Sequence, residues 1–289
     1  MKRVMHVLFN AVAILVLALA NNTTVQAQSR IGIEDRFADV NGVRLHYLIA
    51  GEGHPVILLH GYTQTSRMWR PLMVELAKTH TVIAPDLRGH DRSEQPRSSY
   101  SLEEFLWDFT QMLEQLAIAE PFFLLAHSFG GPIGLTFAAA QPQRLSKLVL
   151  VATAPEMHLN PLLETMLKLP LPLRTLERLR PILLPRVYAP LFVLQRVLAG
   201  TLFPWRGWNL LPTIQTPALI IGGQFDFIAP VAVLQRMCDG LPNARFELIR
   251  YAGHLPQIER PAAVNRAIEG FIERRRSWRG EEEELRIEH

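Results

Sequence analysis

FFLLAHSFGG, residues 122–131, decides how this chain folds. The stretch begins as an apolar, strand-like run, reaches Ser128 and continues through two glycines into a helical segment, Pro132 to Ala140. This order predicts a strand, a sharp turn and a helix, with a strained serine backbone whose hydroxyl is directed out of the sheet. Strand and helix nearly touch at such a turn, so small neighbours are needed; Gly130 meets this need and Ala126 nearly does. Ser128 is therefore a candidate nucleophile, and a buried structural serine is the alternative.

Runs of consecutive apolar residues recur on both sides of this stretch, separated by segments whose apolar residues have helical spacing. Asn41-Gly42, between residues 37–40 and 43–48, is a strong signal for a hairpin. Ser101, with Glu104 three residues later, predicts a helix that begins with a capping box. Unbroken rather than alternating apolar runs are typical of parallel strands covered on both faces. Such runs occur at residues 56–59, 82–84, 148–151, 218–221 and 246–249.

The alternation of strands and helices stops between Ala154 and Pro212. This stretch is rich in leucine, proline and arginine, and its repeated prolines divide it into short helices. We therefore expect an α/β fold, in which a mostly parallel central sheet has helices on both faces and carries an inserted helical lid. The core comprises residues 28–153 and 213–276, the lid residues 154–212, and a charged tail residues 277–289.

The first 27 residues have the pattern of a secretory signal peptide. Lys2 and Arg3 give a positive start, Val7 to Ala20 is a nearly unbroken apolar run, and Val25-Gln26-Ala27 fits a cleavage site. This run is shorter than the ~20 residues that a spanning helix needs. We therefore expect residues 1–27 to be removed and the protein to be exported, to the periplasm or out of the cell. An uncleaved membrane anchor through residues 7–20 is the alternative.

The charge balance gives no reason to propose nucleic acid as a partner. The formal net charge is +3, but without the first 27 residues 28 basic residues stand against 27 acidic ones. Charged residues of the expected lid are mostly basic. They fit either arginines that extend outward from an ordinary amphipathic lid or a weak contact with an anionic membrane surface. Cys238 is the only cysteine, so no intramolecular disulfide can form.

Three polar residues that suit nucleophilic catalysis follow strand runs in the order Ser128, Asp226, His254. A serine hydroxyl is a poor nucleophile near neutral pH, so a histidine must take its proton and a carboxylate must orient that histidine. Asp226 could instead cap the helix that begins near Pro230, and Glu156 is an alternative acid. Histidines in this chain have no spacing typical of metal ligands, so we expect no metal.

This order of serine, aspartate and histidine resembles that of α/β hydrolases, and the similarity extends from about Phe37 to Phe271. It implies that Ser128 attacks an ester-type carbonyl, that His254 acts as general base and then general acid, and that Asp226 orients His254. The motifs that carry the resemblance are His60-Gly61-Tyr62, DLRGH at 86–90, AHSFGG at 126–131, the block from Gly223 to Pro230, and Gly253-His254.

Further expectations follow from the resemblance. The backbone N–H groups of Tyr62 and Phe129 would hold the oxyanion. Ala126 and Asp91 stand where related sequences often carry glycine, which leaves the conformation of the serine turn and of the loop around Asp91 open. Other polar residues at strand ends are expected to shape loops rather than perform chemistry. These are His60, Asp86, Arg88 and His127.

The type of nucleophile limits the classes of activity that we expect for this chain. Epoxide hydrolases and haloalkane dehalogenases, which share the His-Gly loop, use an aspartate nucleophile, so Ser128 argues against both. We expect a serine hydrolase that cleaves carboxylic esters of an apolar small substrate through an acyl-enzyme, with no cofactor. The alternatives are a cofactor-free perhydrolase, similar to haloperoxidases, and a non-hydrolytic ligand-binding protein on the same fold. The acyl and alcohol groups of the substrate and the oligomeric state stay open.

Overall fold

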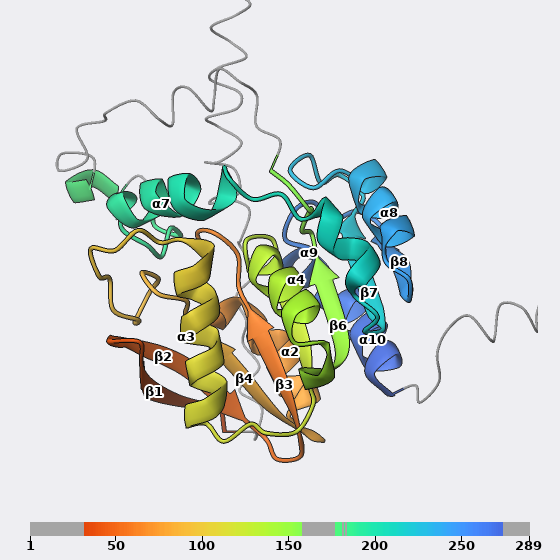
Figure 1. Ribbon diagram of the computed structural model, residues 1–289, viewed down its shortest axis with the longest axis horizontal. Coiled ribbons are helices and arrows are strands. Elements are labelled where there is room, and N and C mark those ends of the chain that lie inside the picture. Colours follow the sequence, from red (N-terminus) through yellow and green to blue (C-terminus); the bar gives the residue numbers. More distant parts are fainter. Residues whose placement is uncertain (1–31, 158–176, 181, 183, 274–289) are drawn as a thin grey trace, which may run out of the picture.

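A computed structural model describes residues 32–157, 177–180, 182 and 184–273. The expected signal peptide, residues 158–176, 181 and 183 of the expected lid, and the charged tail at 277–289 lie outside the described residues. One eight-stranded sheet runs through the described chain, in the order β1-β2-β4-β3-β5-β6-β7-β8 (Figure 1). The expected α/β class, with a mostly parallel sheet, is confirmed.

The sheet combines an antiparallel edge with a parallel centre. β1 pairs with β2, and β2 with β4, in antiparallel register, whereas every other neighbouring pair is parallel. Asn41 and Gly42 join β1 to β2 with φ of 50° and 70°, the positive values that a tight hairpin turn needs. The strands are β1 Glu34–Val40, β2 Val43–Ala50, β3 His54–Leu59, β4 His80–Pro85, β5 Phe122–His127, β6 Leu145–Val151, β7 Ala218–Gly223 and β8 Ala244–Ile249.

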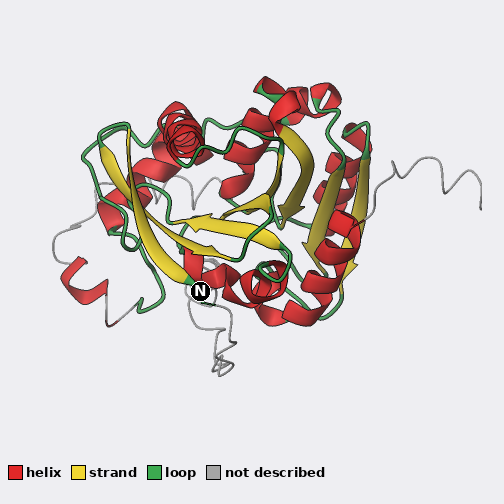
Figure 2. Cartoon of the chain, turned by 90° about the horizontal axis from the view of Figure 1, so that it is seen from below, coloured by secondary structure: helices red, strands yellow, loops and turns green. Residues whose placement is uncertain are grey.

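Helices cover both faces of this sheet, which Figure 2 shows from below. Helices α3, α4 and α8 share one buried apolar cluster with one set of strand side chains, and α2 and α10 share another with the opposite set. In β3, Ile57 and Leu59 belong to the first cluster and Val56 and Leu58 to the second, which explains why the strand is apolar without a break. The helix bounds are α2 Arg70–Leu76, α3 Leu102–Gln115, α4 Gly130–Ala140, α8 Val231–Gly240, α9 Pro256–Glu259 and α10 Pro261–Glu273.

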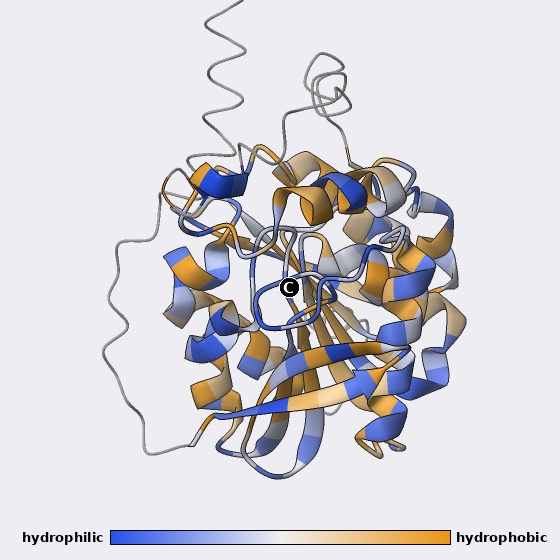
Figure 3. Ribbon diagram, turned by 90° about the vertical axis from the view of Figure 1, so that its left-hand side faces the viewer, coloured by the Kyte–Doolittle hydropathy of each residue, from blue (hydrophilic) through white to orange (hydrophobic). Residues whose placement is uncertain are grey.

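Hydropathy follows this layering. Figure 3 shows apolar colouring concentrated on the inner strands, while the helices carry polar residues on their outer sides. Helix α3 begins with the expected capping box: the Glu104 N–H donates to the Ser101 hydroxyl at 3.5 Å, and the Ser101 N–H donates to the Glu104 carboxylate at 3.1 Å. None of the helices in the described chain combines the length and apolar character that crossing a membrane requires.

The described part of the expected lid lies beyond the carboxyl ends of the parallel strands (Figure 1). It contains α7 Leu191–Val197, a π-helical turn at Leu198–Leu202 and a 3-10 turn at Trp208–Thr213. This segment contacts the loop before α3, because the Arg196 guanidinium donates to the Ser98 carbonyl and the Thr201 hydroxyl donates to the Tyr100 carbonyl. The second half of this segment is thus packed on the core.

Candidate active site

Ser128 occupies the turn between β5 and α4. Its φ is +47°, in the left-handed region that non-glycine residues rarely adopt, as the strand–turn–helix pattern predicted. Three hydrogen bonds hold the turn: the Ser128 N–H donates to the Val151 carbonyl, and the Ser128 carbonyl accepts from the Gly131 N–H and the Thr153 hydroxyl. Because both backbone groups of Ser128 are used, its strained conformation is fixed by its surroundings.

Small residues make this turn possible. A Cβ added at Gly130 would lie 2.9 Å from the Leu59 Cβ, and one added at Gly131 would lie 1.9 Å from the Thr153 hydroxyl oxygen. Ala126, where related sequences often carry glycine, faces Gly134 on α4, and a Cβ at Gly134 would lie 3.2 Å from the Ala126 methyl. The extra methyl of Ala126 is therefore accommodated by a glycine on the facing helix.

Ser128, His254 and Asp226 form one hydrogen-bonded chain. The Ser128 Oγ lies 2.9 Å from the His254 Nε2, and the His254 Nδ1 lies 2.9 Å from the Asp226 Oδ2. The three residues come from the ends of β5, β8 and β7, and both His254 and Asp226 are buried. In this arrangement the His254 Nδ1–H donates to Asp226, which leaves Nε2 free to accept the hydroxyl proton of Ser128.

The second carboxylate oxygen of Asp226 fixes its own loop. Asp226 Oδ1 accepts from the N–H groups of Ile228 and Ala229 at 2.8 and 2.9 Å. Helix α8 instead has Pro230 as its N-cap, without a side-chain cap. Glu156, the alternative acid, accepts from the Trp208 indole N–H at 2.7 Å and lies 3.7 Å from the Arg206 guanidinium. The structure therefore pairs His254 with Asp226.

Three hydrogen bonds hold the main chain around His254. Glu259 accepts from the N–H groups of Gly253 and Leu255, the two residues that flank His254, at 2.7 and 3.1 Å. The His254 carbonyl accepts from the His127 Nε2 at 2.9 Å. Neither Glu259 nor the partner of His127 was identified from the sequence, because the local pattern does not specify which backbone group a buried side chain will meet.

The loop after β3 passes directly over Ser128. A Cβ added at Gly61 would lie 3.2 Å from the Ser128 Cβ and 2.6 Å from the His127 Nδ1, so only a glycine fits there. The loop that leads to Tyr62 therefore lies against Ser128. Within the described chain, neither the Tyr62 N–H nor the Phe129 N–H has a hydrogen-bond partner. Phe129 is also the N-cap of α4, whose positive end favours a negative charge at this point.

Comparison with known proteins supports the fold assignment. A family model described as the alpha/beta hydrolase fold matches residues 54–179. A thermophilic esterase from Thermogutta terrifontis has a similar structure, with a TM-score of 0.71 and 25% identity, over 83% of this chain and 98% of that one. The chain therefore has the α/β-hydrolase fold.

Two curated relatives of this hydrolase differ in how much they share with it. An uncharacterised protein of Mycobacterium bovis is 26% identical over 276 residues, which cover 82% of this chain and 81% of that protein. The cis-3-alkyl-4-alkyloxetan-2-one decarboxylase of Shewanella oneidensis is 37% identical over 120 residues, which cover 40% of this chain and 38% of that protein.

Buried histidines and acids shape the loops of this hydrolase, as their positions at strand ends suggested. The His60 Nδ1–H donates to the Gly61 carbonyl at 2.8 Å, and the Leu87 N–H donates to the His60 Nε2 at 2.9 Å. Burial lowers the pKa of His60 to about 3, which keeps the ring neutral. Asp86 accepts from the Ser66 N–H at 2.6 Å and fixes the end of the same loop. Both residues thereby support the loop that carries Tyr62.

Asp91 has the backbone conformation of a glycine and a side chain with its own contacts. Its φ is +43°. Its carboxylate lies 2.9 Å from the Thr65 hydroxyl and 2.7 Å from the Arg67 guanidinium, and its N–H donates to the Tyr188 carbonyl at 2.6 Å. Asp91 therefore joins the end of the Tyr62 loop to the segment that contains Tyr188.

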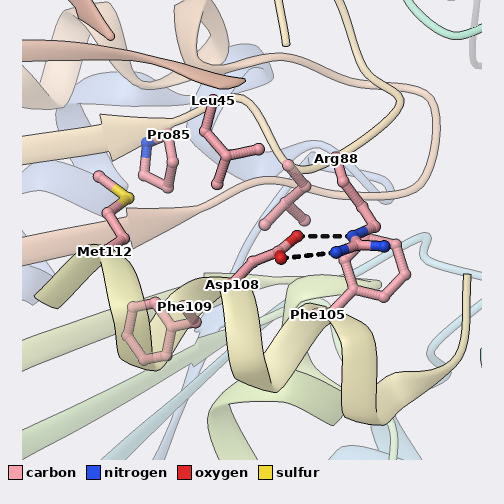
Figure 4. A pocket seen from close by; sticks show the side chains of 8 residues that line it. Leu45, Pro85, Arg88, Phe105, Asp108, Phe109 and Met112 are labelled. Atoms are coloured by element: carbon pink, nitrogen blue, oxygen red, sulfur yellow. Dashed lines mark hydrogen bonds and ion pairs between the residues drawn. The ribbon is translucent and has the colours of Figure 1, made fainter. Parts of the chain in front are cut away.

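A small cavity lies apart from the serine, between β2, β4 and α3 (Figure 4). Its volume of about 10 Å³ is enough for one water at most, so it is no substrate pocket. Arg88 and Asp108 line it and form a two-pronged ion pair with both N–O distances at 2.6 Å. We assign this region to the support of α3. No group of three or more metal-ligating side chains occurs among the residues described.

Proposed function

We propose that this α/β hydrolase is a serine hydrolase that cleaves carboxylic esters of a small, apolar substrate through an acyl-enzyme. The observation that carries the proposal is the Ser128–His254–Asp226 chain, with both distances at 2.9 Å. His254 takes the proton as Ser128 Oγ attacks the carbonyl carbon, and returns it to the leaving alcohol. Water then takes the place of the alcohol and attacks the acyl carbon while His254 takes its proton. His254 returns this proton to Ser128 Oγ as the bond to the acyl group breaks and the acid leaves.

The oxyanion of each tetrahedral intermediate is held by the N–H groups of Tyr62 and Phe129. Both are without partners in the described chain, and Gly61 brings the Tyr62 loop against Ser128. One such donor typically contributes about 3 kcal/mol to transition-state binding. The esterase from Thermogutta terrifontis, at 25% identity, supports ester cleavage as the reaction class. The oxetan-2-one of the Shewanella relative is itself a cyclic ester, which is consistent with an ester-type carbonyl as the target.

A series of p-nitrophenyl esters, from acetate to palmitate, tests the proposal. The full chain should hydrolyse at least one of them, and Ser128→Ala should lose roughly a thousandfold or more in kcat. Thr153→Val is a useful companion variant, because it removes the hydroxyl that donates to the Ser128 carbonyl and leaves the Ser128 side chain in place. Equal rates for the wild type and Ser128→Ala would refute the serine mechanism. Activity that appears only with hydrogen peroxide and a carboxylic acid would favour a perhydrolase.

We further propose that residues 1–27 direct export and are removed. The support is the positive start, the apolar run from Val7 to Ala20 and the Val25-Gln26-Ala27 site. N-terminal sequencing of the protein recovered from the periplasm or medium should begin at Gln28. A membrane-bound protein that retains Met1 would show instead that residues 7–20 form an anchor.

A further inference from the structure

We propose that His127 is a positioning residue for the catalytic histidine. Its neutral Nε2–H group holds the main chain of His254, and its unprotonated Nδ1 faces the Tyr62 loop and sets the distance to that loop. The inference rests on the proposed function, because it assigns His254 as the base. The starting observation is the 2.9 Å contact between the His127 Nε2 and the His254 carbonyl oxygen. A carbonyl can only accept, so Nε2 must carry the proton.

The other ring nitrogen of His127 faces the loop that leads to Tyr62. Its Nδ1 is buried and has no hydrogen-bond partner within the described chain. It faces Gly61, where an added Cβ would lie only 2.6 Å away. One ring therefore fills the space between the His254 main chain and the loop that leads to Tyr62. His127 is 1% exposed and directly precedes Ser128, so its position is fixed by β5.

Electrostatics require this ring to stay neutral. The ring centres of His127 and His254 are 5.2 Å apart, and His60 is a further titratable neighbour. During the reaction His254 becomes positively charged, and a second positive ring at this distance would oppose that step. Burial lowers the pKa of His127 to about 3, so the ring does not compete for a proton at neutral pH.

A matched pair of variants separates the hydrogen bond from the packing. Glutamine and methionine have similar lengths, but only glutamine can donate to the His254 carbonyl. We expect His127→Met to lower kcat by roughly 10- to 100-fold with KM nearly unchanged, because a small displacement of a catalytic group has effects of this size. His127→Gln should restore most of that loss. Equal kcat values for the two variants, with equal melting temperatures, would overturn the inference.

Two further measurements keep the test decisive. Labelling of Ser128 by a fluorophosphonate should be slowed in His127→Met relative to His127→Gln. A wild type that is neither labelled nor active would overturn the proposed function together with this inference, whereas a labelled wild type with indistinguishable variants would overturn the inference alone. Should the methionine variant not fold, nitrogen NMR of the histidine-labelled wild type decides: we expect a neutral Nε2–H ring for His127 at pH 6, and an Nδ1–H or charged ring would contradict the assignment.

Discussion

The Tyr62 hydroxyl donates to the Leu194 carbonyl on α7 at 2.8 Å, so the residue that we propose as an oxyanion donor is tied by its side chain to α7. Burial raises the pKa of the Tyr62 phenol well above its usual value, and the group stays a donor at any ordinary pH. The position of α7 and the geometry of the proposed oxyanion hole are thereby linked through a single residue.

Replacing Tyr62 by phenylalanine tests this link. The change removes one buried hydrogen bond, and we expect kcat/KM to fall by about tenfold, which corresponds to roughly 1.4 kcal/mol. Tyr188→Phe is a matched control, because it removes a hydroxyl that has no hydrogen-bond partner among the described residues and keeps the ring beside Arg67. Ester kinetics on the three proteins give the comparison, and an equal loss in both variants would contradict a specific role for the Tyr62 hydroxyl.

The contact between Ala126 and Gly134 predicts an epistatic pair. Gly134→Ala places a methyl about 3.2 Å from the Ala126 methyl, which sits on a rigid central strand. We expect a net loss of about 1 kcal/mol, since overpacking a core costs ~1–3 kcal/mol and alanine regains up to about 1 kcal/mol of helix propensity. The double variant Ala126→Gly/Gly134→Ala should recover that loss. Thermal or urea unfolding measures both, and strictly additive effects would contradict the packing interpretation.

Two variants of Asp91 separate the free-energy cost of its backbone conformation from the stabilisation that its side-chain contacts provide. Asp91→Ala loses the contacts with Thr65 and Arg67 and keeps the unfavourable φ, whereas Asp91→Gly loses the same contacts and relieves it. We therefore expect the glycine variant to be more stable than the alanine variant by about 1 kcal/mol. Urea unfolding decides, and an alanine variant as stable as the glycine variant would show that φ is not constrained there.

His46 predicts a pH-dependent contribution to stability. It lies between Asp86 and Asp35, with distances of 2.7 and 2.8 Å. Burial would lower its pKa, but the hydrogen bonds with Asp86 and Asp35 outweigh burial and raise the pKa above the usual value. A charged ring donates to both carboxylates and a neutral ring to one. The stabilisation is therefore complete below the unfolded pKa, about 6.5, and is lost as pH rises through the folded pKa.

The free energy of unfolding of the wild type and of His46→Gln should accordingly differ most near pH 6 and least near pH 9.

His80 provides the opposite case, because burial lowers its pKa, so the stability it contributes should be lost as pH falls. Urea unfolding of His46→Gln and His80→Gln across this range tests both signs. A His46→Gln difference that grows toward pH 9 would contradict the charged-ring interpretation.

The sequence predicted those features of the fold that local chemistry determines. Asn41-Gly42 needs a turn with positive φ, Ser101 and Glu104 satisfy each other at a helix start, and unbroken apolar runs require a sheet covered on both faces. Each of these is present in the structure. The serine turn belongs to the same class, because the close approach of strand and helix excludes all but small neighbours at Gly130.

The remaining features depend on partners that are distant in the chain. His127 and the His254 carbonyl are 127 positions apart, and Tyr62 and Leu194 are 132 apart. No local pattern specifies which of many backbone groups a buried donor will meet. The four-residue helix α9 was also missed, since a single turn has too few apolar positions to show a period. It nevertheless supplies Glu259, which holds both neighbours of His254.

The most direct test of the central claim is to trap the covalent intermediate. The full chain is incubated with a fluorophosphonate, digested, and the modified peptide is identified by mass spectrometry. We predict one adduct, on Ser128, which is absent from Ser128→Ala and formed far more slowly in His254→Ala. An adduct on another residue, or a folded wild type that carries none while it hydrolyses esters, would show that Ser128 is not the nucleophile.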